Sequence, residues 1–169
     1  VARVLADIEA LNPDAAVVRA ESPVDFGDPL MLAGKAVLVV DDGSTITHGE
    51  MAFGAGTVAA RYAGASEIID PRPWAVGSIA EVYERFPHIG NVLPAMGYGD
   101  EQLRELEETI NAIPCDVVVT GTPIDLGRLI DSRHLILHAT SSPRAIGEPT
   151  LEELLEPVLH RVDVGVALV

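Results

Sequence analysis

Apolar and polar positions alternate along the first part of this chain in blocks that predict a helix and then two strands. Val1–Leu11 carries apolar residues three and four positions apart, the stripe of an amphipathic helix, and Asn12-Pro13 ends it. Ala15–Ala20 is predicted to be a short strand, and a connector containing Pro and Gly follows it through Gly34. The next strand is the uninterrupted apolar run Ala36–Val40. Such a run is typical of a strand buried on both faces.

The same alternation continues to the end of the chain. Helices are predicted at Ala55–Tyr62, Ser78–Phe86, Asp100–Ala112, Asp125–Ile130 and Thr150–Leu159, and strands at Glu67–Ile69, Asn91–Leu93, Val117–Thr120 and His134–His138. Ser78 and Asp100 are the expected N-caps of their helices, and Thr150 with Glu153 has the spacing of a capping box. Parallel strands separated by helices need right-handed crossovers. The sequence therefore predicts an α/β, Rossmann-like three-layer sandwich with a mainly parallel sheet.

Loops rich in glycine and proline follow four of the predicted strands. They are Asp41–Gly56, Asp70–Gly77, Pro94–Gly99 and Gly121–Leu126. Because parallel strands end at one edge of a sheet, we expect these loops to converge there. That edge is where open α/β sheets usually bind ligands.

Several residues of these loops suit a phosphate group. Gly54 and Gly56 precede a predicted helix, whose first backbone N–H groups can bind an anion, although close helix packing explains the glycines as well. Arg72 stands between two prolines, and a pre-positioned guanidinium suits bidentate phosphate binding; an ion pair with a neighbouring aspartate is the alternative. Thr122 and Asp125 form a second glycine, hydroxyl and carboxylate arrangement, for which helix capping by Asp125 is the alternative.

The loop after Ala36–Val40 also contains candidates for metal binding and catalysis. Asp41 and Asp42 are candidate Mg²⁺ ligands, because Mg²⁺ takes one or two carboxylates together with substrate phosphates. Thr45 is a candidate phosphate contact, and Thr47 and His48 are candidates for the catalytic contact with the reacting group. Each of these residues has a structural alternative. The threonines and one of the two aspartates could cap local structure while the other aspartate is solvated, and the histidine could make a hydrogen bond within the loop.

Composition limits the classes of partner. A chain of 169 residues with 48% hydrophobic residues can bury one sizeable core. The formal net charge of -15, from 26 acidic and 11 basic residues, disfavours nucleic acid and anionic membranes as partners. It indicates either solvated helix faces or adaptation to high salt. No apolar run has transmembrane length and the first residues lack a signal-peptide layout, so we expect a cytoplasmic protein.

Four motifs in order give the chain a family resemblance. The segments VLVVDDGSTITHGEMAFGAG, EIIDPRPWAVGSI, VLPAMGYGDEQLRELEETIN and VVVTGTPIDLGRLI resemble the C-terminal half of the predicted P-loop GTPase family related to cyclic 2,3-diphosphoglycerate synthetase. The resemblance extends over residues 12–130 and weakens beyond Ile130. It implies that residues 1–30 are the tail of a preceding P-loop nucleotide-binding domain and that residues 31–169 are the C-terminal α/β domain.

The resemblance also implies a function. The archaeal synthetase uses ATP to cyclise its diphosphate substrate, whereas most members of the family are predicted GTPases. This chain has no GxxxxGK[ST] segment, so we expect it to be inactive alone, with ATP or GTP and Mg²⁺ bound mainly by an upstream P-loop domain or subunit. The leading hypothesis is the C-terminal portion of a nucleotide-dependent, phosphate-handling enzyme that binds a small phosphorylated substrate or completes the active site.

Two other hypotheses belong to different classes. The first is a non-catalytic binding or assembly module of a P-loop GTPase-like protein, in which a homodimer is also possible. The second, a free-standing dinucleotide-binding protein, is disfavoured because the loop after Val40 lacks the GxGxxG spacing at the end of the strand.

Overall fold

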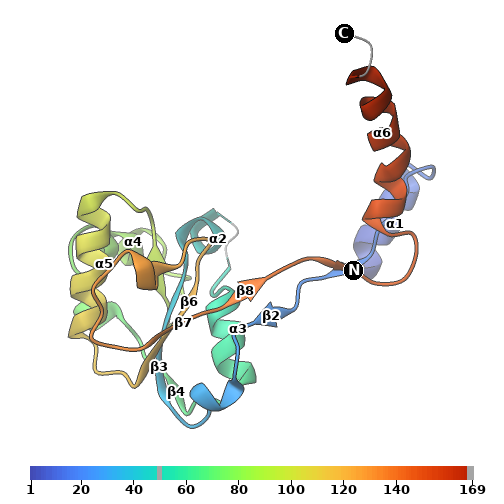
Figure 1. Cartoon of the computed structure of the whole chain (residues 1–169). Coiled ribbons are helices and arrows are strands. Elements are labelled where there is room, and N and C mark those ends of the chain that lie inside the picture. Colours follow the sequence, from blue (N-terminus) through green and yellow to red (C-terminus); the bar gives the residue numbers. More distant parts are fainter. Residues whose placement is uncertain (49–50, 167–169) are drawn as a thin grey trace. The chain divides into compact units, whose positions relative to one another are not determined.

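The computed structural model describes residues 1–48 and 51–166. Contacts divide the chain into two compact units, and Figure 1 labels most of their helices and strands. The sheet unit is Val24–Ser141, and the terminal unit combines Val1–Pro23 with the chain from Ser142 onward. That residues 1–30 are the tail of a preceding nucleotide-binding domain stays a prediction.

The sheet unit is built on a sheet of five parallel strands, one of which is central (Figure 1). The strands are β3 (Ala36–Asp42), β4 (Glu67–Ile68), β5 (Leu93–Ala95), β6 (Val117–Gly121) and β7 (Ile136–His138). On one side, β3 pairs with β6, which pairs with β7. On its other side, β3 pairs with β4 at its amino end and with β5 at its carboxyl end. The central strand is therefore covered along both edges, and Val37 to Val40 are completely buried.

Helices cover both faces of this sheet. Helix α3 (Ala55–Tyr62) packs on β3 and β6, whereas α4 (Gly77–Arg85) and α5 (Asp100–Ala112) pack against each other on the opposite side (Figure 1). The apolar face predicted for α5 is confirmed, since Leu106 and Ile110 are buried in the core. The predicted α/β three-layer sandwich is thus the observed fold.

Shorter elements complete the sheet unit. They are α2 (Gly43–His48), the 3₁₀ turns η1 (Pro29–Met31), η2 (Arg72–Trp74) and η3 (Leu126–Arg128), and the antiparallel pair β2 (Val24–Asp25) and β8 (Thr140–Ser141). The predicted helix Asp125–Ile130 is therefore only a 3₁₀ turn, and part of the predicted loop Asp41–Gly56 is helical.

The terminal unit contains two helices and a short antiparallel strand pair. They are α1 (Ala2–Leu11), α6 (Leu151–Val166) and the pair β1 (Ala20–Glu21) with β9 (Arg144–Ala145). The predicted capping box opens α6: the backbone N–H of Glu153 donates to Thr150 Oγ1 at 3.2 Å, and that of Thr150 donates to Glu153 Oε2 at 2.8 Å. No helix in the described part of the chain is both long and apolar enough to cross a bilayer.

Some predicted boundaries were wrong. Residues 15–19 form no strand, because only Ala20 and Glu21 find a partner, in β9. The predicted strand Asn91–Leu93 begins two residues later, and the side-chain amide of Asn91 instead donates to the carbonyl of Ile68 at 3.2 Å. These differences depend on pairing with distant segments, which local periodicity does not contain.

Both predicted N-caps were also wrong. The N-cap of α4 is Val76, and the backbone N–H and the hydroxyl of Ser78 bind the Glu105 carboxylate of α5. The N-cap of α5 is Gly99, so Asp100 occupies the first helical position. There a carboxylate still interacts favourably with the helix dipole.

Candidate functional site

Three of the four predicted loops meet at the carboxyl edge of the sheet. Asp42 at the end of β3 is in register with Ala95 of β5, and Asp41 is in register with Gly121 of β6. The fourth loop begins farther from this edge, because β4 ends beside Val37, near the amino end of β3. Its last residue, Gly77, lines one pocket together with Gly99, the last residue of the loop after β5.

Asp41 is completely buried and binds the amino end of α3. Its Oδ2 accepts hydrogen bonds from Gly54 N at 2.7 Å and Thr57 Oγ1 at 3.2 Å, and its Oδ1 accepts one from Gly56 N at 2.8 Å. The carboxylate thus takes the place at this helix end that a bound anion would occupy. The amides of Gly54 and Gly56 are engaged, as is Asp41 itself, so the geometry favours close helix packing over phosphate or Mg²⁺ binding for these three residues.

The environment of Asp41 shifts its titration. Burial raises the pKa of this carboxyl, and the hydrogen bonds from Gly54, Gly56 and Thr57 oppose that rise. Burial is the larger effect, so the pKa of Asp41 lies above the ordinary value of an aspartate.

Asp42 has a different role from its neighbour. Its Oδ2 accepts hydrogen bonds from Thr45 N and Thr45 Oγ1, both at 3.1 Å, and a very short one from Ser44 Oγ, so Asp42 caps α2. Thr45 is accordingly used within the cap. Oδ1 of Asp42 makes no hydrogen bond within the described residues, and the side chain is only partly buried. One carboxylate oxygen thus remains available to a ligand.

A metal site made by the protein alone is not found in residues 1–48 and 51–166, where no three His, Cys, Asp or Glu side chains gather. Mg²⁺ is usually held by one or two carboxylates, waters and substrate phosphates. Asp42 suits that arrangement, because it offers one free oxygen at the edge of the sheet.

The two predicted catalytic residues lie at the end of α2. Thr47 is buried, and its hydroxyl donates to the Gly43 carbonyl at 2.7 Å, one helical turn earlier. His48 is exposed, with Nδ1 3.1 Å from Thr47 Oγ1 and 3.3 Å from the Ser44 carbonyl. The Thr47 hydroxyl is therefore occupied by a hydrogen bond within the helix. The ring of His48, by contrast, is exposed and accessible to a ligand.

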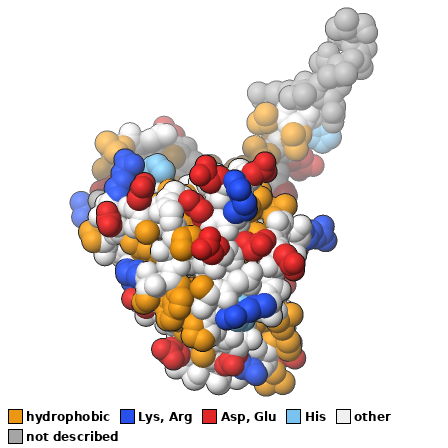
Figure 2. Space-filling model, turned by 90° about the vertical axis from the view of Figure 1, so that its left-hand side faces the viewer, with side chains coloured by type: hydrophobic (Ala, Val, Ile, Leu, Met, Phe, Trp, Pro, Cys, Tyr) orange, Lys and Arg blue, Asp and Glu red, His pale blue; other side chains and the backbone are white. Residues whose placement is uncertain are grey.

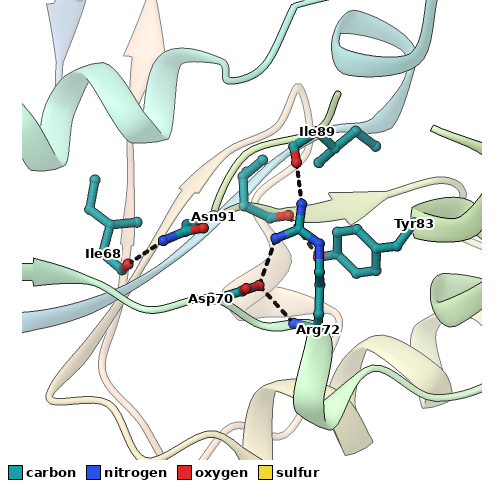
Figure 3. A network of polar contacts seen from close by, with 7 residues as sticks. Ile68, Asp70, Arg72, Tyr83, Ile89 and Asn91 are labelled. Carbon is teal, nitrogen blue, oxygen red and sulfur yellow. Dashed lines mark hydrogen bonds and ion pairs between the residues drawn. The ribbon is translucent and has the colours of Figure 1, made fainter. Parts of the chain in front are cut away.

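Arg72 is held by a network of its own segment (Figure 3). Nη1 lies 2.8 Å from Asp70 Oδ1, Nη2 donates to the carbonyl of Ile89, and the guanidinium stacks 4.9 Å from the ring centre of Tyr83. These contacts tie the chain after β4 to the chain before β5. The structure thus favours the ion-pair alternative for Arg72 over phosphate binding.

Replacing Arg72 by alanine is expected to lower the free energy of unfolding by about 2 kcal/mol, because it leaves the buried carbonyl of Ile89 without its charged donor. Urea denaturation followed by circular dichroism measures this loss. The control is Arg128→Ala, since Arg128 is 85% exposed and makes only a surface ion pair with Asp125. Equal stability of the two variants would show that the network of Arg72 does not stabilise the fold.

Thr122 and Asp125 are placed differently from each other. Thr122 is buried at the end of β6, and its hydroxyl donates to the carbonyl of Ile124 at 2.6 Å. Asp125 accepts a hydrogen bond from Gly127 N at 3.1 Å and pairs with Arg128, so it caps η3, as the alternative interpretation held. Thr122 directly follows β6, whereas Asp125 belongs to the next turn.

Three polar residues at this edge were missed from the sequence. Thr120 of β6 is in register with His138 of β7, and His138 Nε2 lies 2.8 Å from the carbonyl of Thr122. Tyr98 lies in the loop after β5, where burial and, to a smaller extent, the charge of Asp42 raise its pKa. The sequence signal for these residues is the alternation of polar positions at the ends of the strands. Sequence reasoning considered mainly the loops rich in glycine and did not use this signal.

We call Asp42, Tyr98, Thr122 and His138 the edge cluster. Within the described residues, the Tyr98 hydroxyl has no hydrogen-bond partner, and neither does the completely buried hydroxyl of Thr120. A carbonyl only accepts, so the proton of a neutral His138 lies on Nε2 and its Nδ1 carries a lone pair. The edge cluster can therefore donate to a small polar ligand, accept from it, and take up a proton.

Comparison with known proteins gives one informative match. The chain is 51% identical over 154 residues to a protein of Thermococcus kodakarensis named arginine synthetase ArcE. That stretch is 91% of this chain and 34% of the relative, so the chain spans about a third of the length of the curated relative it matches. No family model and no solved structure match the chain.

Proposed function

We propose that this chain is the substrate-binding portion of a nucleotide-dependent, phosphate-handling enzyme related to arginine synthetase. The observation that carries the proposal is the edge cluster, which gathers a carboxylate and an imidazole from two strands, and a phenol and a hydroxyl from two loops, at the carboxyl edge of a parallel sheet. Ligands of open α/β sheets bind at this place. The similarity to a protein whose name denotes synthesis of arginine supports an enzymatic role.

In this proposal the edge cluster orients a small substrate, including a phosphorylated one. Asp42 would hold Mg²⁺ through its free oxygen, and the ion would supply the charge neutralisation that phosphoryl transfer needs. His138 would exchange a proton with the substrate, because its Nδ1 has a free lone pair when the ring is neutral. The exposed ring of His48 is a second candidate for this contact.

The proposal assigns the nucleotide mainly to an upstream P-loop domain or subunit. Walker-type phosphate binding needs a glycine-rich loop with a lysine, which this sequence lacks, and the glycine amides of α3 are engaged by Asp41. ATP or GTP would therefore bind mainly to a P-loop domain or subunit that meets this chain. The sequence resemblance to predicted GTPases related to cyclic 2,3-diphosphoglycerate synthetase belongs to the same proposal.

One observation favours the alternative of a non-catalytic assembly module. The terminal unit exposes large apolar side chains on both of its helices, including Leu11 at 87% and Leu159 at 59%. Surfaces of this kind mark interaction sites. An assembly module, however, gives no reason for the unpartnered hydroxyl of Tyr98 beside Asp42.

Calorimetry of the intact chain with Mg²⁺ tests the proposed function. We expect saturable binding of a small substrate probe, L-arginine or 2,3-diphosphoglycerate, and none of ATP or GTP. Tyr98→Phe is expected to raise the dissociation constant five- to tenfold, corresponding to one hydrogen bond of about 1 kcal/mol. Tyr62→Phe is the control, because that ring is 82% exposed on α3. Binding of nucleotide alone, or of no probe, would contradict the proposal.

A further inference from the structure

Two antiparallel strand pairs connect the sheet unit with the terminal unit, and both belong to one ribbon. In the pair of β1 and β9, Glu21 is opposite Arg144, and in the pair of β2 and β8, Val24 is opposite Ser141. Each strand advances by three residues between these two positions, so both pairs share a single register. We call residues 20–25 and 140–145 the ribbon, of which Figure 1 labels β2 and β8.

The middle of the ribbon is unpaired. The shared register places Pro23 opposite Ser142 and Ser22 opposite Pro143. All four residues are exposed, and within the described residues no backbone hydrogen bond joins them across the ribbon. The boundary between the two compact units lies directly after Pro23 and directly before Ser142.

Pro23 explains the gap in the ribbon. The backbone N–H of Ile146 donates to the carbonyl of Arg19 at 2.8 Å, so these two residues occupy a hydrogen-bonded pair of the same ladder. Such pairs recur at every second residue, so Pro23 and Ser142 occupy one as well. Pro23 has no N–H to donate there, whereas Pro143 occupies a non-hydrogen-bonded pair, in which the backbone N–H points away from the partner strand. Pro23 therefore breaks the ladder, and Pro143 does not.

Contacts hold the chain on either side of the gap. On the side of the terminal unit, Arg144 Nε donates to Glu21 Oε1 across the ribbon at 2.9 Å. On the side of the sheet unit, the backbone N–H of Ala139, the residue after His138, donates to the carbonyl of Thr120 at 2.7 Å. His138 is thus tied to β6 before the chain enters the ribbon.

We propose that residues 22–23 and 142–143 are a hinge, through which the terminal unit changes its orientation to the sheet unit. A two-stranded ribbon resists bending through its ladder of hydrogen bonds, and here the ladder is missing at the same level on both strands. Hinges are commonly a few residues at the ends of elements that absorb changes in φ and ψ. The paired segments on either side move as rigid pieces, so the edge cluster stays assembled during the motion.

Distance distributions between spin labels test the hinge, measured by double electron–electron resonance on the intact chain diluted with unlabelled chain. In a Cys115→Ala background, the labels are placed at Glu108→Cys on α5 and Glu156→Cys on α6, which are both exposed. Acidic side chains are scattered over the face shown in Figure 2, so the loss of one changes that surface little. The reference pair, Glu108→Cys with Tyr62→Cys, lies within the sheet unit. We expect a broader distribution between the units than for the reference pair.

Two proline variants test the cause of the motion. Pro23→Val restores an N–H that faces the carbonyl of Ser142, and it is expected to narrow the distribution between the units to about half its width. The matched control is Pro143→Val, whose new N–H points away from the partner strand and should leave the width unchanged. Fluorescence of Trp74 checks that the sheet unit of each variant is folded.

Hydrogen exchange reports the ladder directly. We expect the backbone N–H of Ser142 to exchange fast in the wild type and about tenfold or more slowly in Pro23→Val. A distribution between the units as narrow as that of the reference pair would overturn the hinge. Equal widths in Pro23→Val and Pro143→Val, or a broader distribution in Pro23→Val than in the wild type, would overturn the assignment of the hinge to the gap at Pro23.

Discussion

Replacing Asp41 by alanine is expected to lower the free energy of unfolding by about 2–4 kcal/mol, because the N–H groups of Gly54 and Gly56 lose their acceptor at the buried end of α3. Urea denaturation measures the loss. The matched control is Asp42→Ala, which removes the partly exposed cap of α2 and should cost only about 1 kcal/mol. Similar losses in both variants would show that the contact between Asp41 and α3 contributes little.

The titration of Asp41 gives a second test of the same contact. Burial raises its folded-state pKa above the ordinary value of an aspartate, so over part of the pH range the native protein keeps a proton that the unfolded chain has lost. The resulting stability is complete below the unfolded pKa and is lost as the pH rises through the folded pKa. Asp41→Asn cannot titrate, so the stability difference between wild type and this variant should shift towards the variant over that pH range. A pH-independent difference would contradict the raised pKa.

Local patterns predicted the parts of the fold that depend on neighbouring residues. The apolar run Ala36–Val40 lies within β3, and the predicted helices Ala55–Tyr62 and Asp100–Ala112 are observed with the same bounds. Buried strands and amphipathic helices show their period in the sequence, since each buried position follows from the geometry of the element. The layer architecture then followed from the order of the elements.

The parts that failed depend on segments distant in the chain. Nothing local shows that β4 ends beside Val37 while β5 continues along β3, so the loop at Asp70 begins farther from the carboxyl edge than the sequence predicted. In the same way, the hydrogen bonds of Asp41 join residues 13 to 16 positions apart. His138 became visible as a candidate only once β7 was paired with β6.

The glycines near Asp41 were predicted to approach a phosphate, and the structure shows that they approach a carboxylate. A Cβ on Gly54 would lie 2.8 Å from Asp41 Cγ, and a Cβ on Gly56 would lie 2.9 Å from Asp41 Oδ1. Sequence reasoning left phosphate binding and close helix packing open for these glycines. It could not decide between them, because a ligand oxygen and a protein carboxylate satisfy the same helix N–H groups.

Gly121→Ala is expected to lower the free energy of unfolding by about 4 kcal/mol or more, which is the second large effect predicted at this site. The new Cβ would lie 2.3 Å from Asp41 Oδ1 and 2.4 Å from Gly56 N. These two atoms are joined by a hydrogen bond of 2.8 Å, so neither can move away without weakening that bond. The control is Gly127→Ala, whose Cβ would be 3.3 Å from Asp125 Oδ1 and should change stability by less than about 1 kcal/mol.

Combining the two substitutions shows whether the close approach to Asp41 explains the glycine. In Asp41→Ala/Gly121→Ala the carboxylate oxygen nearest to the new Cβ is gone, and Gly56 N is no longer held against it. The double variant should therefore lose at least 1 kcal/mol less than the sum of the two single losses, which is the sign of coupled neighbours. Additive losses would mean that Gly121 is required for the approach of α3 itself, independently of the buried carboxylate.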